Sequence, residues 1–427
     1  MKVLMFGWEF PPHIAGGLGT ACYGLTKGLA QNNVEVTFVM PNAFGDEDQS
    51  YIRIINASDV EFDTRYGKEY LFENQVSFIE VNSQLVPYIG LDDYYHIVNQ
   101  LESNVFQYDE IGQKLRYQFS GSYSENLLSE VQNYAFVAAE LARTQVFDII
   151  HAHDWLTYKA GIAAQQISGK PLVVHVHATE FDRSGEHNIN DIVYNMEREG
   201  MLAADMVCAV SDFTRHIIIE KYEIPPEKVF TLHNAVDFGN KEIKRTRPLK
   251  EKIVTFLGRV TFQKGPEYFV ETAKKVLQYD DNVRFVLAGD GDRMQPIIEY
   301  VAELGIADKF HFTGFLHGSD IETMFGMSDV YVMPSISEPF GISPLEAMSA
   351  GVPVIISKQS GVSEVLQYAI KVDFWDVDAM ADAIWGILHY PALSEMFSAY
   401  GKEEVHQLQW ANTAAKLKEI YKQLLHL

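Results

Sequence analysis

The sequence predicts an α/β protein made of two doubly wound domains, each with a parallel sheet covered by helices. Short apolar runs typical of buried strands alternate with helical segments along most of the chain, as they do in such domains. The chain has 427 residues, which is too long for one ordinary domain. We expect the strands of a first sheet at residues 2–7, 34–40, 146–153, 172–178, 206–211 and 229–233. We expect the strands of a second sheet at residues 253–258, 283–288, 310–313, 330–334 and 352–357.

The two sheets set the expected domain boundaries. We assign residues 1–238 to the first domain and 239–408 to the second, joined within a charged segment that holds Pro248. Segment 42–117 interrupts the alternation and is too long for a plain loop, so we expect an elaboration of the first domain. Segment 409–427 should contain a helix at 413–425 that packs back on the N-terminal domain. Its apolar residues have helical spacing: Leu417, Ile420, Tyr421 and Leu424.

Composition excludes several classes of protein. A formal net charge of -24 argues against nucleic acid or an anionic membrane as a partner. We find no apolar run of about 20 residues and no signal peptide, so we expect a cytoplasmic protein without an integral membrane segment. The two cysteines, Cys22 and Cys208, lie far apart in apolar contexts and should be buried thiols.

The most informative segment follows the strand predicted at 330–334 and reads S-E-P-F-G-I-S-P-L-E-A-M. It places Glu338 in a strand-to-helix loop and Glu346 in the first turn of a helix predicted at 345–350. Backbone N–H groups at a helix start suit a phosphate, and a carboxylate accepts hydrogen bonds from sugar hydroxyls. The segment therefore predicts a site for a phosphorylated sugar, although two ordinary acids at a loop and a helix start are the alternative. The phosphate would bind the N–H groups of Phe340, Gly341, Ile342 and Ser343.

A second candidate phosphate site follows the first strand, in F-G-W-E-F-P-P-H-I-A-G-G-L-G-T. Gly16 and Gly17 precede a predicted helix, so their backbone can approach a phosphate at its start. A dinucleotide-binding fingerprint fits poorly, because the glycines begin nine residues beyond Gly7 and no ribose-binding acid follows the second strand. A glycine turn needed only for packing remains an alternative.

Two cations follow the first strand of the second domain, in F-L-G-R-V-T-F-Q-K-G. Arg259 and Lys264 flank a short loop, where they would clamp a diphosphate and stabilise its negative charge as it leaves. Open α/β sheets bind ligands at the carboxyl ends of their strands, which favours this interpretation over two ordinary surface cations.

Four histidines close two predicted strands, in H-A-H-D-W and V-H-V-H-A-T-E-F-D. Alternate residues of a strand share one face, so His151 lies with His153 and His175 lies with His177. We expect structural histidines, of which one or two reach the site. A metal site is the alternative, but no carboxylate or histidine ligands are gathered at helical spacing, and we expect no metal.

Taken together, these motifs resemble those of the retaining group 1 glycosyltransferases. The resemblance spans nearly the whole chain and includes A-G-D-G and E-A-M-S-A-G-V-P-V-I, and the N-terminal half is similar to bacterial and archaeal glycogen and starch synthases. It implies the GT-B fold, in which two Rossmann-like domains face a central cleft. The first domain would be the acceptor side, and the second would bind the nucleotide sugar.

The resemblance also implies roles for residues of the second domain. Arg259 and Lys264 would hold the donor diphosphate, Glu338 would contact hydroxyls of the transferred sugar, and Glu346 would contact the ribose.

In the first domain, the resemblance places His177 beside the anomeric carbon and puts Glu9 and Asp154 at other positions of the cleft. The chain departs from the glycogen synthases at Ile14, where they usually carry a lysine that helps to bind the diphosphate. The run H-A-T-E-F-D also departs from their V-H-N pattern, so acceptor contacts are expected to differ.

The activity implied is retaining, metal-independent transfer of a hexose, expected to be glucose, from ADP- or UDP-glucose to a saccharide such as glycogen or another α-glucan, with no cofactor. Other acceptors stay open: a lipid, a cell-envelope polysaccharide or a small molecule. A sugar-nucleotide sensor is the alternative without catalysis. Aromatic residues of segment 42–117 would stack on an acceptor sugar or form a small core of their own: Tyr88, Tyr94, Tyr95, Phe106 and Tyr108.

Overall fold

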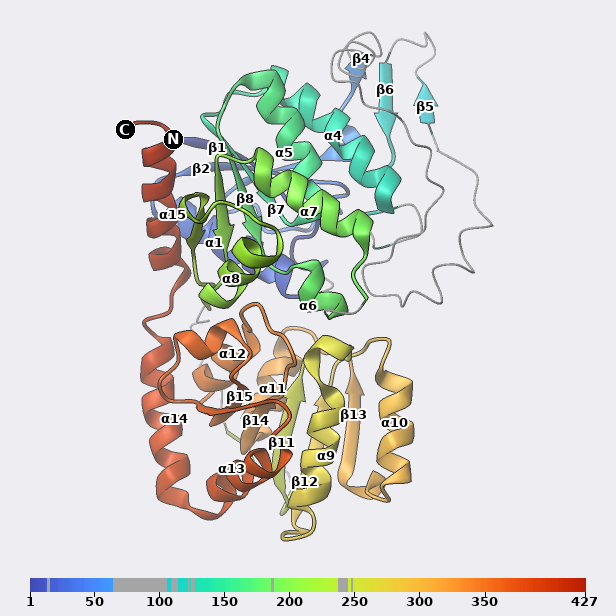
Figure 1. The fold of residues 1–427 in the computed structure, drawn as a ribbon, viewed down its shortest axis with the longest axis vertical. Coiled ribbons are helices and arrows are strands. Elements are labelled where there is room, and N and C mark those ends of the chain that lie inside the picture. Colours follow the sequence, from blue (N-terminus) through green and yellow to red (C-terminus); the bar gives the residue numbers. More distant parts are fainter. Residues whose placement is uncertain are drawn as a thin grey trace.

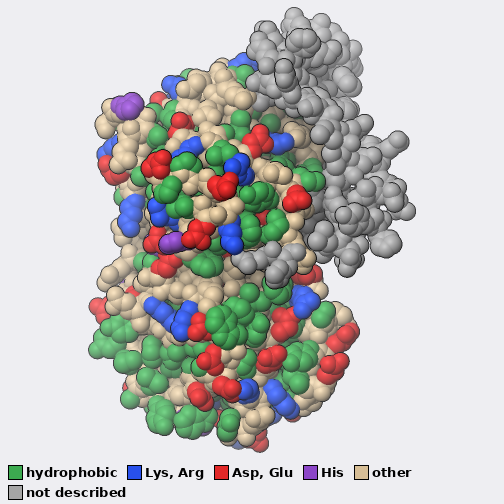
Figure 2. Space-filling view, in the orientation of Figure 1, with side chains coloured by type: hydrophobic (Ala, Val, Ile, Leu, Met, Phe, Trp, Pro, Cys, Tyr) green, Lys and Arg blue, Asp and Glu red, His purple; other side chains and the backbone are tan. Residues whose placement is uncertain are grey.

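The computed structural model describes residues 1–13, 16–63, 106–108, 114–121, 123, 127–185, 188–236, 245–246 and 249–427, and the structural statements below refer to these. Two α/β domains lie one above the other in Figure 1, and both ends of the chain lie at the N-terminal domain. Figure 2 shows a face on which acidic and basic side chains are interspersed over both domains.

The N-terminal domain is built on a parallel sheet with strand order β10-β9-β8-β7-β1-β2-β3. Chain order reverses between β1 and β7, and ligands of open α/β sheets bind at the carboxyl ends of strands at such a point. The strands are β1 (Lys2–Phe6), β2 (Glu35–Met40), β3 (Arg53–Asn56), β7 (Ile149–His153), β8 (Leu172–Val176), β9 (Met206–Ala209) and β10 (Val229–Thr231).

The C-terminal domain has a second parallel sheet with strand order β13-β12-β11-β14-β15-β16. Here the order reverses between β11 and β14, which are the strands that precede Lys264 and Glu338. The strands are β11 (Lys252–Leu257), β12 (Val283–Ala288), β13 (Phe310–Gly314), β14 (Val330–Met333), β15 (Val354–Ser357) and β16 (Ile370–Val372).

Helices pack on both faces of each sheet, through apolar side chains of the strands. In β1, Leu4 and Phe6 belong to one cluster while Val3 and Met5 belong to another, as the two-residue period of a strand requires. The N-terminal helices are α1 (Gly17–Gln31), α4 (Leu127–Thr144), α5 (Trp155–Ser168), α6 (Glu180–Ser184), α7 (Asp191–Ala203) and α8 (Asp212–Lys221). Those of the C-terminal domain are α9 (Pro266–Val276), α10 (Met294–Glu303), α11 (Ser319–Met327), α12 (Ser343–Ser349), α13 (Val377–His389) and α14 (Pro391–Val405).

The last helix, α15 (Trp410–Leu424), returns to the N-terminal domain and packs on α1 (Figure 1). A Cβ built on Gly24 would lie 2.2 Å from the indole nitrogen of Trp410, and one on Gly28 would lie 2.4 Å from the Trp410 carbonyl oxygen. Leu417 and Tyr421 join the apolar cluster on that face of the sheet. Glycine in α1 therefore makes room for the closing helix.

All eleven predicted strands are present, with ends shifted by a few residues. The short edge strands β3 and β16 were not predicted from the sequence. Nor was a small antiparallel sheet of β4 (Phe62–Asp63), β6 (Lys114–Tyr117) and β5 (Phe106–Tyr108). Helix α12 begins two residues before the predicted 345–350, because Pro344 fits the first turn. Helix α15 begins three residues before the predicted 413–425, at Trp410.

Three sequence predictions fall on residues that the structure does not describe. The boundary at 238 and 239 lies within residues 237–244, so the domain limits stay a prediction. Most of the elaboration at 42–117, with Tyr88, Tyr94 and Tyr95, lies outside the described residues, as do the side chains of Phe106 and Tyr108. Ile14 is also outside them.

Candidate active site

The glycine turn of the N-terminal domain faces the cation loop of the C-terminal domain. Gly16 precedes α1 with an extended backbone, and a Cβ built on it would lie 3.8 Å from Cδ of Arg259. A Cβ on Gly17 would meet nothing within 4 Å. Glu9 is buried and accepts a hydrogen bond from the Gly19 N–H at 3.0 Å, which fixes the first turn of the helix. Two motifs far apart in sequence thus meet at the domain boundary.

Lys264 and Glu338 form an ion pair at the switch point of the C-terminal sheet. The Lys264 Nζ contacts Glu338 Oε2, and the Ser335 hydroxyl donates to the same oxygen at 3.3 Å. Glu338 is only 5% exposed, so it is no ordinary surface acid. A Cβ built on Gly265 would lie 2.3 Å from the Pro334 carbonyl oxygen, so this glycine lets the cation loop approach the end of β14. The ion pair therefore joins two loops, one after β11 and one after β14, whose backbones are in close contact.

The loop from Glu338 leads directly into α12. Gly341 has a φ of +99°, a backbone conformation that favours glycine. Within the described part of the chain, the backbone N–H groups of residues 340–343 donate no hydrogen bond. The binding of a phosphate by the N–H groups of Phe340, Gly341, Ile342 and Ser343 stays a prediction, and among the described residues these groups have no acceptor that would compete with it.

Glu346 lies in the first turn of α12, as predicted, and is half-buried. Burial raises its pKa from 4.5 to about 7. The nearby Tyr331 hydroxyl shares a hydrogen bond with Ser343 Oγ at 2.8 Å, and burial and the charges of Glu338 and Glu346 raise the pKa of that phenol. A ligand that donates hydrogen bonds to Glu346 would favour its ionised form.

The four histidines form a stack at the carboxyl ends of β7 and β8. His153 Nδ1 is 2.8 Å from His177 Nε2, and His151 Nε2 is 3.3 Å from His175 Nδ1. The rings of His175 and His177 stack with centroids 4.3 Å apart. Burial lowers the pKa of all four rings, that of His177 to about 3, so the stack is neutral near pH 7. The Tyr421 hydroxyl of α15 closes the stack at 2.6 Å from His151 Nδ1.

Asp154 fixes the backbone beside His177. Its Oδ1 accepts hydrogen bonds from the N–H groups of His177 at 2.6 Å and Ala178 at 3.4 Å. Asp154 has a φ of +56°, which is uncommon outside glycine, and burial raises the pKa of its carboxyl to about 7. Asp154, which follows β7, thus links the end of β7 to the segment after β8 by hydrogen bonds.

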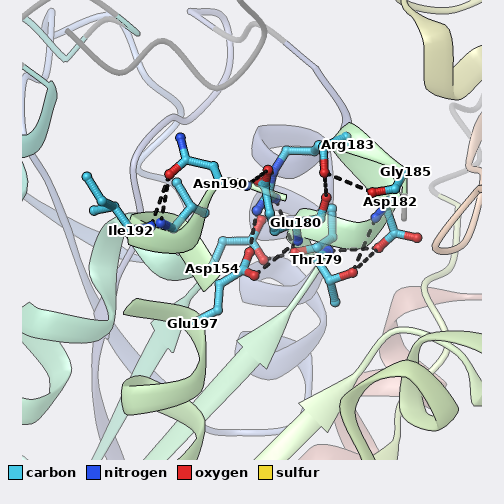
Figure 3. Close-up of polar contacts among 12 residues, drawn as sticks. Asp154, Thr179, Glu180, Asp182, Arg183, Gly185, Asn190, Ile192 and Glu197 are labelled. Atoms are coloured by element: carbon cyan, nitrogen blue, oxygen red, sulfur yellow. Dashed lines mark hydrogen bonds and ion pairs between the residues drawn. The ribbon is translucent and has the colours of Figure 1, made fainter. Parts of the chain in front are cut away.

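A buried ionic network next to Asp154 was not predicted from the sequence (Figure 3). Arg183 contacts the carboxylates of Glu180 and Glu197, and Glu197 also accepts from the Tyr222 hydroxyl. Thr179 and Asp182 form a capping box at the start of α6, a signal present in the sequence as T-E-F-D. The network holds α6 against the rest of the domain.

Several hydrogen bonds near the candidate site join the N-terminal domain to the C-terminal domain. The Ser337 hydroxyl donates to Asp182 Oδ1 at 2.6 Å, which ties the residue before Glu338 to α6. Glu364 of the short helix η5 (Gly361–Glu364) accepts from the N–H groups of Asp212 at 2.8 Å and Phe213 at 2.6 Å, at the start of α8. His233 Nε2 lies 2.9 Å from the same carboxylate. These contacts, which the sequence did not indicate, set the two faces opposite each other.

The fold and the site match known protein families. A model of the starch synthase catalytic domain matches residues 2–231, a little over half of the chain, and a model described as glycosyl transferases group 1 matches residues 237–404. This chain is a group 1 glycosyltransferase. The family confirms the resemblance read from the motifs.

Relatives align along nearly the whole glycosyltransferase chain. An uncharacterized glycosyltransferase of Methanocaldococcus jannaschii is 27% identical over 99% of this chain and 98% of its own length. A glycogen synthase of Mycobacterium tuberculosis is 21% identical over 99% of this chain and 94% of its own length.

Solved structures share the GT-B arrangement of two Rossmann-like domains. A sucrose-phosphate synthase from Thermosynechococcus elongatus superposes with a TM-score of 0.73 at 18% identity, over 100% of this chain and 99% of its own. The Anabaena protein HepE, solved in complex with UDP and glucose, has a TM-score of 0.66 at 18% identity, over 99% of this chain and 100% of its own. Among the described helices, none is both long and apolar enough to cross a membrane.

Proposed function

We propose that this glycosyltransferase is a retaining hexosyltransferase that moves glucose from ADP- or UDP-glucose to an α-glucan or a similar saccharide. The observation that carries the proposal is the approach of the glycine turn at Gly16 to Arg259, beside the pair of Lys264 and Glu338. A diphosphate bound there would meet two cations and the N–H groups of two helix starts. The glucosyl group and the glucan acceptor are supported by the starch synthase catalytic domain and the glycogen synthase relative.

The proposed roles on the C-terminal face follow from charge. Lys264 and Arg259 would stabilise the diphosphate as the bond to the sugar breaks. Because Lys264 already contacts Glu338, a bound donor would place a phosphate and a carboxylate around one ammonium group. Glu338 would then accept hydrogen bonds from sugar hydroxyls, and Glu346 would accept them from the ribose.

The proposed roles on the N-terminal face follow from neutrality and position. His177 is uncharged and held by Asp154 and His153, so it would offer a fixed hydrogen-bonding edge beside the anomeric carbon without adding charge. The acceptor hydroxyl would attack from the face that the diphosphate leaves, its oxygen would bond to the anomeric carbon, and its proton would pass to the departing phosphate. This route retains configuration and requires no metal.

The experiment is to measure release of ADP and of UDP from their glucose conjugates, with and without a maltooligosaccharide or glycogen primer and without added metal. Primer-dependent release from one donor supports the proposal and names the nucleotide. Retention is tested by NMR of the new linkage, which should be α. Turnover of neither donor with primer would contradict the glucan assignment, and a lipid or small-molecule acceptor would then become the next candidate.

A further inference from the structure

A group of possible metal ligands lies where α1 meets the carboxyl ends of β7 and β8. Cys22 of α1, His153 at the end of β7 and His177 after β8 each offer one ligand atom, and these atoms lie within 4.8 Å of one another. Cys22 and His153 are fully buried, whereas His177 is half-buried. Three elements that are distant in sequence thus bring a thiol and two imidazoles together.

The composition of this group selects the class of ion. Thiolate and imidazole ligands are typical of zinc sites, whereas magnesium and calcium prefer oxygen. Zinc bonds of about 2.0–2.3 Å put the ligand atoms of a tetrahedral site roughly 3.3–3.8 Å apart. Starting from 4.8 Å or less, the three ligands would close on an ion by movements of at most about 1.5 Å.

One ring nitrogen of the group lacks a partner. Among the described residues, His153 Nε2 is buried and has no hydrogen bond, while Nδ1 of the same ring is 2.8 Å from His177. Buried polar atoms without partners are uncommon and call for an explanation. A cation bound through Nε2 of His153 would give one and would leave the contact of Nδ1 with His177 in place.

Two other clusters of possible ligands are less suitable. In the group of His151, His153 and His175, both nitrogens of His151 already have partners, Tyr421 and His175. In the group around Glu364, both carboxylate oxygens accept from backbone N–H groups of α8. An ion at the first site would cost His151 one of these hydrogen bonds, and an ion at the second would remove the acceptor from the start of α8. The group of Cys22 has one such bond between two of its own members, from His153 Nδ1 to His177 Nε2, and leaves Nε2 of His153 unpaired.

We propose that Cys22, His153 and His177 form a binding site for a zinc-class divalent cation, and that its occupancy inhibits sugar transfer by engaging His177. On binding, the Cys22 thiol would lose its proton to solvent and become a thiolate ligand. The inhibition rests on the proposed function, because it depends on the role of His177. The binding itself does not.

Binding is tested by titrating the metal-free 427-residue chain with Co²⁺ and then displacing the cobalt with Zn²⁺. We expect one equivalent of cobalt with thiolate-to-cobalt charge-transfer absorption. Loss of an outer-shell partner alone costs about 10–100-fold in metal affinity, so removing a direct ligand in Cys22→Ser should weaken binding by at least about 100-fold. Cys208→Ser is the matched control, since Cys208 is also a buried free thiol but belongs to none of the ligand groups found among the described residues. Absence of the thiolate band, or equal binding by Cys22→Ser, would overturn the site.

Inhibition is tested by titrating Zn²⁺ into the transfer assay. Wild-type and Cys208→Ser activity should fall as the site fills and return when a chelator is added, whereas Cys22→Ser should resist. Full transfer by wild-type protein whose site is shown to be filled would overturn the inhibitory role. A metal-free protein that transfers no sugar at all would count against the proposed function, and the cobalt titration would still decide the site.

Discussion

The candidate site lies between a face of the N-terminal domain and a face of the C-terminal domain, and these two faces differ in charge. The C-terminal face presents a paired lysine and glutamate, with Arg259 nearby. The N-terminal face presents a stack of neutral histidines, braced by Asp154. In the proposed function, one domain would match the charge of the donor and the other would shape an uncharged surface around the reacting carbon. Variants of the two faces should therefore fail in different ways.

The largest effect is expected for Glu338→Gln. It removes the carboxylate that pairs with Lys264 and would bind the transferred sugar, and loss of such a fixed electrostatic contact costs about 10²–10³-fold in kcat. Steady-state transfer assays measure the change. Glu251→Gln is the control, because Glu251 pairs with Arg284 just before β11, at the opposite end of the sheet. A kcat for Glu338→Gln as high as for the control would refute the assigned role.

Lys264→Met should lower kcat/KM for the donor by roughly 100-fold, since it removes one of two cations from the diphosphate. It should also weaken binding of the nucleotide product, measured by calorimetry. Lys309→Met, which removes a lysine that contacts Glu251, is the control. Combined with Glu338→Gln, the double variant should show a coupling energy of about 0.5–3 kcal/mol. Strict additivity would show that the pair does not act as a unit.

On the neutral face, Asp154→Ala should lower kcat by about tenfold, because hydrogen bonds to a charged group contribute roughly 1.5–3 kcal/mol. The affinity for nucleotide should stay unchanged, since Asp154 contacts the backbone of His177 and Ala178. Asp154→Asn keeps an oxygen at the same place and should restore most of the rate. A weaker nucleotide affinity in the alanine variant would erase the distinction between the two faces.

Glu346 should make the donor affinity of the C-terminal face sensitive to pH. Its folded pKa of about 7 lies above the ordinary 4.5, so protonation below pH 7 should raise the donor KM by up to about tenfold, and Glu346→Gln should abolish this dependence. The raised pKa of Glu346 affects the stability of the fold in the opposite direction from donor binding. The folded state prefers the protonated acid, so its contribution is present below pH 4.5 and is lost as pH rises through 7. At about 1.4 kcal/mol per pKa unit, the free energy of unfolding should change by at most about 3.5 kcal/mol, and denaturant titration at pH 5 and 8 measures the change.

The smallest effect on activity is expected at the contact between η5 and α8, which joins the two domains. Glu364→Gln keeps one oxygen but loses the charge at the start of α8, and should lower kcat/KM by about two- to fivefold. Glu404→Gln is the control, because Glu404 likewise accepts from two backbone N–H groups, those of Gln367 and Tyr368, but within one domain. Equal losses in both variants would indicate a general effect on stability.

The sequence predicted the parts of the site that depend on local pattern. Strand exits, the helix start at Glu346 and the glycine turn at Gly16 follow from short runs of residues, and topology then gathers strand ends at one edge. Pairing between distant residues does not follow from such runs. The contact of Lys264 with Glu338 joins residues 74 positions apart, and the contact of Ser337 with Asp182 joins residues 155 apart.

The burial of charged side chains was also not predictable from the sequence. Arg183, Glu197 and Asp182 appear in ordinary polar stretches, yet each is largely shielded from water. Their burial depends on how α6 and α7 close over the end of β8. The pKa values of Asp154 and Glu346 depend on the same packing, because burial is the leading cause of both shifts.

The return of α15 to α1 also bears on how the chain folds during synthesis. Residues 1–236 emerge from the ribosome well before Trp410, so the surface around Gly24 and Gly28 must wait uncovered while the whole C-terminal domain is translated. The C-terminal domain is thus able to finish folding first, although it is made second.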